Sequence, residues 1–454
     1  MPSLNVWMNG EKVGEWGSLR TGTPFFKYAE SWAESPRARA LSLSLPLTAD
    51  LEVRGDKVEY YFDNLLPDNS DIRRRLRARF QTRSSETFDL LAAIGRDCVG
   101  AVQLLPPGEE PIGWNRVDAE LLDEQQVEET LRRVTSSTPL GRDEQDDFRL
   151  SIAGAQEKTA LLGMRGQWYR PHGATPTTHI FKLPLGMVGD FAGDLSDSVE
   201  NEWLCAEFLR ALDMPVARST IEKFGDQRAL VVARFDRRWI GVDDAAVQRK
   251  RFSPTEGIWI ARLPQEDFCQ ATGRPASRKY EADGGPSMSE CLELLANGET
   301  PEVDRANFVL AQFAFWMLAA IDGHGKNFSL FHRTGGSYGM TPLYDVLSAW
   351  PVIGPGKNQL PSRRAKLAMA VRGKNAHYLL DEVQARHWQL LATRTGQPDL
   401  WDRITRLVEL APAVFDRLEQ RMADKFPEHV FTTIRDGVRR QSERFMRSLR
   451  SIAN

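Results

Sequence analysis

The segment Ala319–Phe331, AAIDGHGKNFSLF, places an aspartate, a histidine, a lysine and an asparagine close together in a mostly apolar run. Polar groups in such a run are costly to bury without partners. Two explanations are open. The polar residues end a helix, with Gly323 and Gly325 in turn conformations, or they carry chemistry. The preceding segment, FVLAQFAFWMLAAI (Phe308–Ile321), is too short to cross a bilayer and predicts a buried helix.

The spacing of three oxygen-bearing side chains favours chemistry. Asn327 follows Asp322 by five positions, and Asp345, in TPLYDVLSAW, comes eighteen positions after Asn327, behind an expected strand pair. Protein kinases have an Asp and, five residues later, an Asn in the catalytic loop, and a second Asp after a short hairpin. The first Asp orients or accepts the proton of the attacking hydroxyl, and the other two residues hold Mg²⁺, which prefers oxygen ligands. The motif DGHGKN lacks the H-R-D pattern, so an ordinary eukaryotic-type protein kinase is not expected.

Two further polar residues lie inside this motif. His324 could be a metal ligand or a base, but no partner His or Cys lies at ligand spacing. We therefore favour an orienting or backbone-contacting role for His324, close to the nucleotide. Lys326 is expected in the catalytic group, paired with the carboxylate of Asp322 or with a phosphate.

Upstream segments supply the remaining parts that a kinase requires. Lys182 in HIFKLP lies on a predicted strand, like the lysine of V-A-I-K, although a solvated lysine at a strand end is the plainer interpretation. On the following helix, Glu202 is the best candidate for its partner and Glu200 the second. The loop in SIAGAQEKTALL (Ser151–Leu162) is not a Walker loop. Its small residues would let backbone N–H groups approach phosphate, although it could also be a plain hairpin loop.

The composition is that of an ordinary globular protein. A chain of 454 residues suggests two or more lobes. The net charge is -3, so any contact with nucleic acid must come from a local basic patch. The start of the chain lacks the basic and apolar pattern of a signal peptide. The four cysteines form no C-x-x-C pair, which predicts reduced, mostly buried thiols and a cytoplasmic protein without a structural zinc site: Cys98, Cys205, Cys269 and Cys291.

Four segments are expected along the chain. Residues 1–108 alternate strands with short helices and begin with a hairpin around Asn9-Gly10. Residues 109–147 contain a linker and a helix, and residues 148–258 a small antiparallel sheet with one helix. Residues 259–454 are expected to be helical apart from one strand pair, with several Arg-rich amphipathic helices from Ala365 onward.

Eight separated segments together resemble the HipA family of bacterial serine/threonine kinases, which are toxins of type II toxin–antitoxin modules. Six lie in the C-terminal part: SIAGAQEKTALL, THIFKLP, ARFDRRW, RLPQEDFCQ, DGHGKNFS and PLYDVLSAWP. Two lie in the N-terminal part: YFDNLLPD and DLLAAIGRDCVGAV. The resemblance extends from Leu4 to about Pro427. It implies an α+β, bilobal protein-kinase-like fold with a small antiparallel-sheet N-lobe, an all-helical C-lobe and an additional N-terminal α/β domain.

The resemblance also implies roles for individual residues in binding ATP and Mg²⁺. Asp322 matches the catalytic base, Asn327 and Asp345 the metal ligands, and Lys182 the ATP-binding lysine. Ser151 matches the serine that the family autophosphorylates. The phosphate loop would be Ala153, Gly154, Ala155, Gln156, Glu157 and Lys158, and the hinge that holds adenine would be Ala233, Arg234 and Phe235. Phosphoserine carries a charge of about -1.5 to -2, so phosphorylated Ser151 would repel nucleotide and switch the kinase off.

The family's partners are further implications. They are a HipB-like helix-turn-helix antitoxin, operator DNA bound through it, and a protein substrate such as an aminoacyl-tRNA synthetase, with the glutamyl enzyme as one example.

Two basic helices, Asp71–Phe80 and the C-terminal one, are solvated faces or DNA contacts, and Arg394 is a further candidate for DNA. A polar insertion, Trp239–Trp259, departs from the family and is expected to be a flexible loop that alters substrate access. Two other functions are open: a non-catalytic transcriptional corepressor and a small-molecule kinase.

Overall fold

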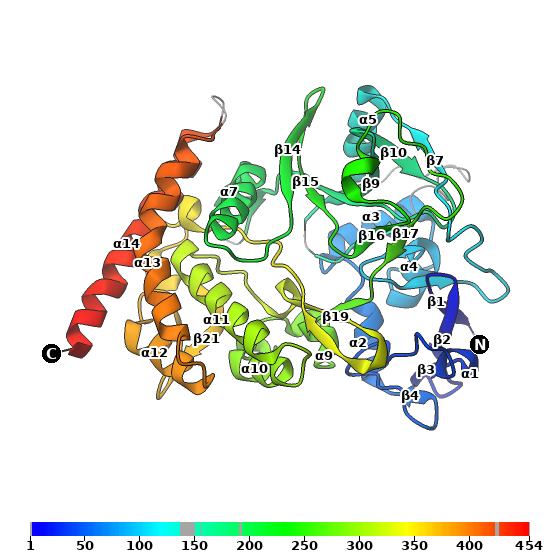
Figure 1. The fold of residues 1–454 in the computed structure, drawn as a ribbon, viewed down its shortest axis with the longest axis horizontal. Coiled ribbons are helices and arrows are strands. Elements are labelled where there is room, and N and C mark those ends of the chain that lie inside the picture. Colours follow the sequence, from blue (N-terminus) through cyan, green and yellow to red (C-terminus); the bar gives the residue numbers. More distant parts are fainter. Residues whose placement is uncertain (1, 137–149, 155, 190–192, 423–425, 454) are drawn as a thin grey trace. The chain divides into compact units, whose positions relative to one another are not determined.

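The computed structural model describes the chain except for residues 1, 137–149, 155, 190–192, 423–425 and 454 (Figure 1). It is a mixed helix-and-sheet protein with two units. The first unit contains Met1–Leu183, Glu222–Ser277 and Ser329–Tyr338, and the second contains Pro184–Ile221, Arg278–Phe328 and Gly339–Asn454. These units cut across the four predicted segments.

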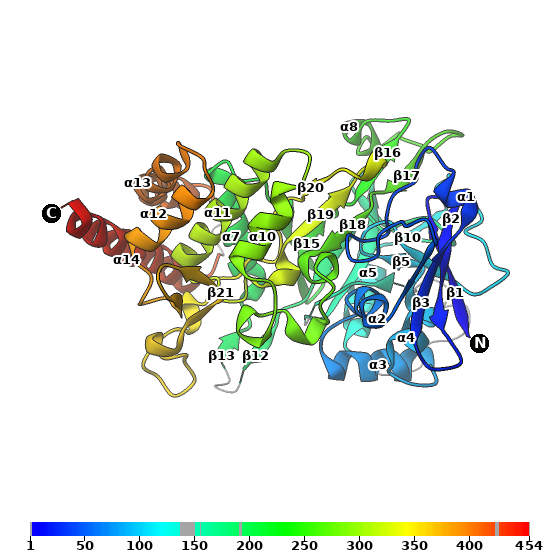
Figure 2. The same cartoon turned by 90° about the horizontal axis from the view of Figure 1, so that it is seen from below.

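The first unit begins with a five-stranded antiparallel sheet in the order β4-β3-β2-β1-β6, of which β1, β2 and β3 are labelled in Figure 2. Its strands are β1 (Ser3–Met8), β2 (Glu11–Ser18), β3 (Pro24–Tyr28), β4 (Glu52–Arg54) and β6 (Gln103–Leu105). Asn9 and Gly10 have φ of 46° and 83°, so the predicted hairpin is confirmed. The described strands here pair antiparallel, so the domain is α+β, and the predicted α/β class is wrong.

Four helices and a short strand accompany this sheet: α1 (Glu30–Ala33), α2 (Asp56–Asp63), α3 (Ser70–Phe80), α4 (Thr87–Ile94) and β5 (Asp97–Cys98). Trp16 of β2 stacks on Phe62 of α2, with ring centroids 4.0 Å apart, inside a large buried cluster. The helix predicted for Asp71–Phe80 is confirmed as α3. Asn69 caps it by accepting hydrogen bonds from the backbone N–H groups of Asp71 and Ile72.

A second sheet has six strands in the order β14-β15-β11-β9-β10-β7. They are β7 (Ala119–Leu121), β9 (Lys158–Met164), β10 (Gln167–Pro171), β11 (His179–Lys182), β14 (Ser219–Phe224) and β15 (Gln227–Ala233). Helix α5 (Glu124–Val134) begins at Asp123, which forms a capping box with Gln126. The segment predicted as linker and helix therefore contributes an edge strand as well.

The insertion Trp239–Trp259 is not only a loop. It contains the second half of β16 (Arg237–Ile240), helix α8 (Asp244–Val247) and the first residue of β17 (Trp259–Arg262), and β16 pairs with β17. Val247 is fully buried in a cluster with Leu162 and Ile260. The polar sequence of this segment gave no sign that Val247 packs against Leu162 of β9.

Short elements follow, all of them in the first unit except Gly339 and Met340. β8 (Leu150–Ser151) pairs in parallel with β5. β18 (Gln265–Asp267) pairs with β19 (Ser329–His332), which precedes β20 (Tyr338–Met340), and α9 (Phe268–Ala271) follows β18.

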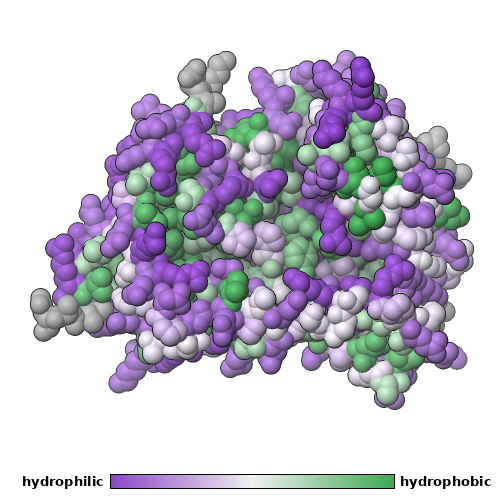
Figure 3. All heavy atoms as spheres, viewed as in Figure 1, coloured by the Kyte–Doolittle hydropathy of each residue, from purple (hydrophilic) through white to green (hydrophobic). Residues whose placement is uncertain are grey.

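The second unit is built around α11 (Pro301–Leu318), which confirms the predicted buried helix. Helices α10 (Met288–Ala296), α12 (Ala385–Arg394), α13 (Leu400–Glu419) and α14 (Glu428–Ala453) contact α11, and α7 (Ser198–Ala211) contacts α13 and α14. Trp316 of α11 is fully buried and lies near Trp388 and Phe445. The side of α13 and α14 seen in Figure 3 carries many hydrophilic side chains.

The prediction of an all-helical C-lobe is wrong. β21 (Lys366–Arg372) and β22 (Ala376–Leu379) form a hairpin where Arg-rich helices were expected. A second strand pair of this unit, β12 (Gly186–Val188) with β13 (Gly193–Leu195), lies in the segment that was predicted to form a small sheet. The segment of β21 reads KLAMAVR, with five consecutive buried residues, a pattern that fits a buried strand as well as a helix. In the described part of the chain, no helix is both long and apolar enough to span a membrane.

Candidate phosphoryl-transfer site

The segment DGHGKN lies directly after α11 in the second unit. The helix ends at Ala319, whose φ of 48° is left-handed, and the N–H of Ala320 donates to the carbonyl of Phe315 at 2.8 Å. Asp322 comes three residues later. The explanation that Asp322 and Asn327 end this helix is therefore wrong, because Ala319 already does so.

The loop is held by short-range contacts. The N–H of His324 donates to the carbonyl of Asp322 at 2.8 Å, and that of Asn327 to the carbonyl of His324 at 3.0 Å. Neither Gly323 nor Gly325 has a positive φ. A Cβ at Gly323 would lie 2.4 Å from the Phe315 ring, so close packing requires glycine there.

Asn327 and Asp345 lie side by side. The Asn327 amide Nδ2 is 3.2 Å from the carbonyl oxygen of Asp345 and 3.5 Å from its carboxylate. The Oδ1 atom of Asn327 is buried and has no hydrogen-bond partner within the residues that the structure describes. Asp345 has a φ of 59°, a left-handed conformation that is rare outside glycine and concentrates at functional sites.

This pair fits a hard divalent cation. A buried amide oxygen without a partner is costly unless something binds it, and an Asn amide oxygen together with an Asp carboxylate is a donor set that Mg²⁺ accepts. Among the described residues, no three His, Cys, Asp or Glu side chains gather as an all-protein metal cage. Mg²⁺ commonly takes only one or two protein ligands and completes its shell with water and phosphate.

Asp322 differs from this pair in being open to solvent. Its side chain is 63% exposed, and its Oδ1 accepts a hydrogen bond from the Tyr280 hydroxyl. The Nε2 atom of His324 is 3.7 Å from the same oxygen. An exposed carboxylate on a rigid loop can reach an incoming hydroxyl.

The other two polar residues of the motif are buried. His324 and Lys326 are 5% and 7% exposed. The backbone of Lys326 is fixed by Tyr344, whose hydroxyl donates to the Lys326 carbonyl at 2.8 Å. The predicted pairing of Lys326 with a carboxylate or a phosphate remains a prediction.

Helix α7 is joined to the segment that follows Asp345. Asn201 donates to the carbonyl of Ser348 at 2.8 Å and accepts from its N–H at 2.8 Å. Glu200 and Glu202 are buried on the same helix. The second unit therefore holds both candidate glutamates and both candidate metal ligands, whereas Lys182 ends β11 in the first unit. The pairing of Lys182 with Glu202 remains a prediction.

The predicted phosphate loop lies in the first unit. Gly154 has a φ of 112°, and the Lys158 ammonium donates to the carbonyl of Ala153 at 2.7 Å. Gln156 donates to the carbonyl of Leu183 at 2.5 Å. Ala155 lies outside the described residues. Gly154 therefore has a backbone conformation that other residues rarely adopt, and the binding of phosphate by this loop remains a prediction.

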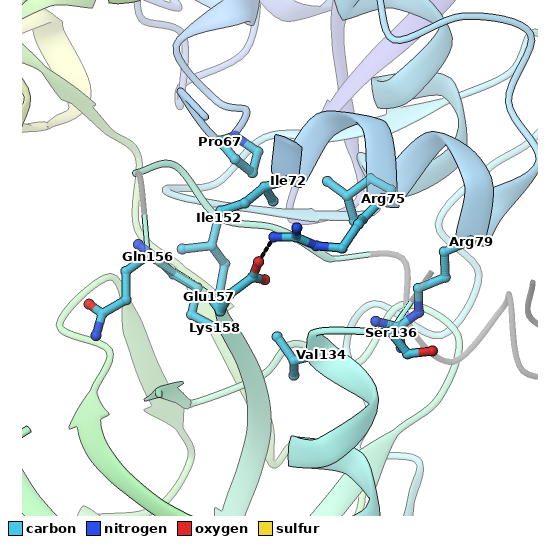
Figure 4. Close-up of a pocket in the computed structure, with 11 residues that line it drawn as sticks. Pro67, Ile72, Arg75, Arg79, Val134, Ser136, Ile152, Gln156, Glu157 and Lys158 are labelled. Atoms are coloured by element: carbon cyan, nitrogen blue, oxygen red, sulfur yellow. Dashed lines mark ion pairs between the residues drawn. The ribbon is translucent and has the colours of Figure 1, made fainter. Parts of the chain in front are cut away.

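The N-terminal domain holds this loop at three points. Ser151 is fully buried, and its hydroxyl donates to the carbonyl of Leu65 at 2.8 Å. Pro67 forms a parallel bridge with Gly154. The third point is an ion pair between Arg75 of α3 and Glu157, shown as the dashed line in Figure 4. It lies at a pocket of about 60 Å³.

The predicted adenine hinge is a tight turn between β15 and β16. The Arg234 N–H already donates to the carbonyl of Thr178 at 2.9 Å, so an adenine contact remains a prediction for other backbone groups of Ala233–Phe235. Ala233 pairs with His179 of β11. Burial lowers the pKa of His179 to about 4, which keeps its imidazole neutral at pH 7.

The Arg234 side chain belongs to a buried ion cluster around Asp97. The carboxylate of Asp97 is 2.9 Å from Arg237, 3.1 Å from Arg262 and 3.5 Å from Arg234, and Asp236 also pairs with Arg234. Burial by itself would raise the pKa of Asp97, but the guanidinium groups of Arg237, Arg262 and Arg234 outweigh it and hold this pKa far below its usual range. The cluster joins β5 to the turn after β15.

Three contacting residues were missed from sequence: Tyr280, Arg75 and Asp97. Asp97 lies in the quoted segment DLLAAIGRDCVGAV, and Arg75 in the basic segment predicted as a helix. Neither segment indicates which residues Asp97 or Arg75 would contact. The segment KYEADGG around Tyr280 contains turn residues and gives no sign of a contact with Asp322.

The basic surfaces carry fewer uncompensated charges than the sequence suggests. On α14, Arg435, Arg439, Arg444 and Arg447 each lie near a carboxylate. Such pairs are typical of a solvated helix face. Arg394 is exposed on α12, and its contact with DNA remains a prediction.

Comparisons with known proteins agree with the resemblance. Residues 4–105 match the HipA N-terminal domain and residues 150–427 the HipA-like C-terminal domain. The chain is 32% identical over 432 residues to the putative kinase Y4mE of Sinorhizobium fredii, covering 93% of each chain. It is 28% identical over 366 residues to the serine/threonine-protein kinase toxin HipA of Shewanella oneidensis, covering 76% of this chain and 75% of that one.

A solved structure has the same fold. A chain in the complex of HipA, HipB and operator DNA from Shewanella oneidensis superposes with a TM-score of 0.76 at 23% identity, covering 99% of both chains. The matched domains span most of the sequence, and both candidate metal ligands lie within the second of them. The chain therefore belongs to the HipA family.

Proposed function

We propose that this protein is an ATP- and Mg²⁺-dependent serine/threonine protein kinase. The observation that carries the proposal is the Oδ1 atom of Asn327, which is buried and has no hydrogen-bond partner among the described residues. Asn327 lies next to Asp345 and on the same loop as the exposed Asp322. The two units would serve as the small and large lobes of a kinase-like fold, with the N-terminal domain added to the small one. Relatives named as kinases support the activity.

The second unit would supply the chemistry of transfer. Asp322 would accept a hydrogen bond from the substrate serine or threonine and hold its oxygen in line for attack. Positioned acid–base groups typically contribute about 10²–10⁴-fold to a rate. Asn327 and Asp345 would hold Mg²⁺, which when bound neutralises charge on the nucleotide phosphates. The buried side chains of Lys326 and His324 would hold the DGHGKN loop in its conformation.

The first unit would bind the nucleotide. The backbone of the loop from Ala153 to Lys158 would face the phosphates, Lys182 would contact them, and Glu202 would orient Lys182. The turn Ala233–Phe235 would contact adenine. The bend at Gly154 supports the first of these roles.

Autophosphorylation at Ser151 would switch the kinase off. Because Ser151 is fully buried and bonded to Leu65, it must leave this place before any kinase reaches it. A phosphoserine carries too much charge to return to a fully buried site. The loop would then stay displaced and bind nucleotide poorly.

The wider role would be that of a toxin. The relative from Shewanella oneidensis is named as a kinase toxin, and the structural match comes from a complex with HipB and operator DNA. We propose a HipB-like antitoxin as partner, operator DNA bound through that complex, and growth arrest through phosphorylation of a translation-related protein. An aminoacyl-tRNA synthetase such as the glutamyl enzyme would be a target of this kind.

Transfer of labelled γ-phosphate from ATP with Mg²⁺ tests the kinase activity. We expect wild type to label itself on Ser151, located by mass spectrometry. Asp322→Asn should transfer at least about 100-fold more slowly than wild type, with a residual rate that long incubations can measure. Ser151→Ala should transfer only to other proteins. If wild type neither binds ATP nor transfers phosphate, the kinase proposal fails and the corepressor alternative replaces it.

A further inference from the structure

The segment Lys279–Glu281 is fastened to the second unit on both sides of Tyr280. The N–H of Gly325, in the candidate catalytic loop, donates to the Lys279 carbonyl at 3.1 Å. On the other side, Glu281 accepts from the N–H of Ala370 at 2.7 Å and from the Arg372 guanidinium, both in β21. Two neighbouring anchors leave the backbone of Tyr280 little freedom.

The segment also turns tightly behind Tyr280. The N–H of Gly285 donates to the Tyr280 carbonyl at 2.8 Å, and Gly284 has a φ of 93°. A Cβ at Gly285 would lie 2.7 Å from the backbone of Lys279. The turn requires glycine at both positions, so the sequence YEADGG fixes the direction in which Tyr280 leaves the chain.

The Tyr280 ring is fixed as well. It packs edge-on against His324, with centroids 5.0 Å apart and planes at 85°, and the Lys279 ammonium lies 5.7 Å from its centroid. The Tyr280 hydroxyl donates to Oδ1 of Asp322. A rigid donor therefore faces one oxygen of an otherwise exposed carboxylate.

This arrangement has a consequence for the reaction. A carboxylate at an exposed position rotates freely about its last torsion, and most of its orientations point away from a substrate hydroxyl. A donor that holds Oδ1 stops this rotation and leaves Oδ2 as the acceptor for the substrate. We propose that Tyr280 is a positioning residue that orients Asp322 for phosphoryl transfer. This inference rests on the proposed kinase function.

The substitution Tyr280→Phe tests it, because it keeps the ring and its contacts with His324 and Lys279. We would measure transfer from labelled ATP with Mg²⁺ to dephosphorylated casein, a generic serine substrate, together with the KM for ATP and the melting temperature. We expect kcat to fall about tenfold, which is the effect of losing one hydrogen bond to a charged group. The KM for ATP and the melting temperature should stay unchanged. The matched control is Tyr60→Phe, a half-buried tyrosine of the N-terminal domain, which should leave kcat at the wild-type value.

A double-mutant cycle separates positioning from general loosening of the loop. If Tyr280 acts through Asp322, then Tyr280→Phe should cause no further loss in the Asp322→Asn background. A further tenfold loss there would contradict the inference, and so would a single variant as fast as wild type. A faster single variant would mean that the hydroxyl occupies the substrate's place, which also overturns it. If wild type transfers nothing, the kinase function fails and the role of Tyr280 falls with it.

Discussion

The amide of Asn327 donates to the backbone carbonyl of Asp345 at 3.2 Å, and its own oxygen is buried with no partner in the described part of the second unit. The hydrogen bond fixes which end of the amide faces Asp345, so the oxygen is presented in one direction. A buried acceptor held in this way is poised for a cation.

Loss of that oxygen should weaken metal binding. We expect Asn327→Ala to raise the Mg²⁺ concentration for half-maximal transfer by roughly 10-fold or more, because one ligand is removed from an already small protein set. A titration of transfer rate against Mg²⁺ measures this. Asn297→Ala, which removes an exposed amide at the end of α10, is the control. An unchanged Mg²⁺ requirement in Asn327→Ala would rule out this ligand.

The ion pair between Arg75 and Glu157 should restrain the phosphate loop. Their side chains are 32% and 20% exposed, so the pair is only partly screened and is expected to contribute about 1 kcal/mol. Arg75→Gln should therefore release the loop more often and speed phosphorylation of Ser151 about fivefold. Time-resolved mass spectrometry follows the reaction. Arg74→Gln, which breaks an exposed pair within α3, should have no effect.

Charge at Ser151 should displace the loop. We expect Ser151→Asp to weaken ATP binding at least about tenfold, because burying a carboxylate at this fully buried position is costly and the charge would move to water. Ser151→Ala removes the hydroxyl without adding charge and should bind ATP as wild type does. Fluorescent-nucleotide titration compares the two. Equal affinities would count against the switch.

Neutralising Asp97 should destabilise the first unit. Asp97→Asn leaves Arg237 and Arg262 buried with one carboxylate fewer, and the expected loss is about 3–5 kcal/mol in the free energy of unfolding at pH 7. Chemical denaturation measures it. The exposed Asp50→Asn is the control and should lose less than about 0.5 kcal/mol.

The effect of Asp97→Asn on the free energy of unfolding should depend on pH. The pKa of Asp97 is lower in the folded protein than in the unfolded chain, where it is about 3.9. The contribution of Asp97 to the free energy of unfolding is therefore complete above that unfolded pKa and is lost as the pH falls toward the folded pKa. The gap in stability between wild type and Asp97→Asn should therefore be constant from pH 7 to about pH 5 and shrink below about pH 4. A gap that widens in acid would contradict this assignment.

Local sequence was sufficient for the features that depend on neighbours along the chain. The Asn9-Gly10 turn and the buried helix α11 were predictable, because turn geometry and helical periodicity act over a few residues. The spacing of Asp322, Asn327 and Asp345 could be read directly from the sequence. The order of the motifs identified the family. The prediction failed at β21, where a short apolar run suits a strand and a helix equally.

Tertiary structure alone decided which distant side chains meet. Tyr280 reaches Asp322 across 42 positions, and Ser151 reaches Leu65 across 86. No periodicity encodes such pairs, because they result from how separate elements pack and not from the preference of any one of them. The sequence by itself determined the candidate catalytic motif and the family. The packing decided that the Asn327 amide oxygen is buried, that Tyr280 contacts Asp322, and that the N-terminal domain contacts the predicted phosphate loop.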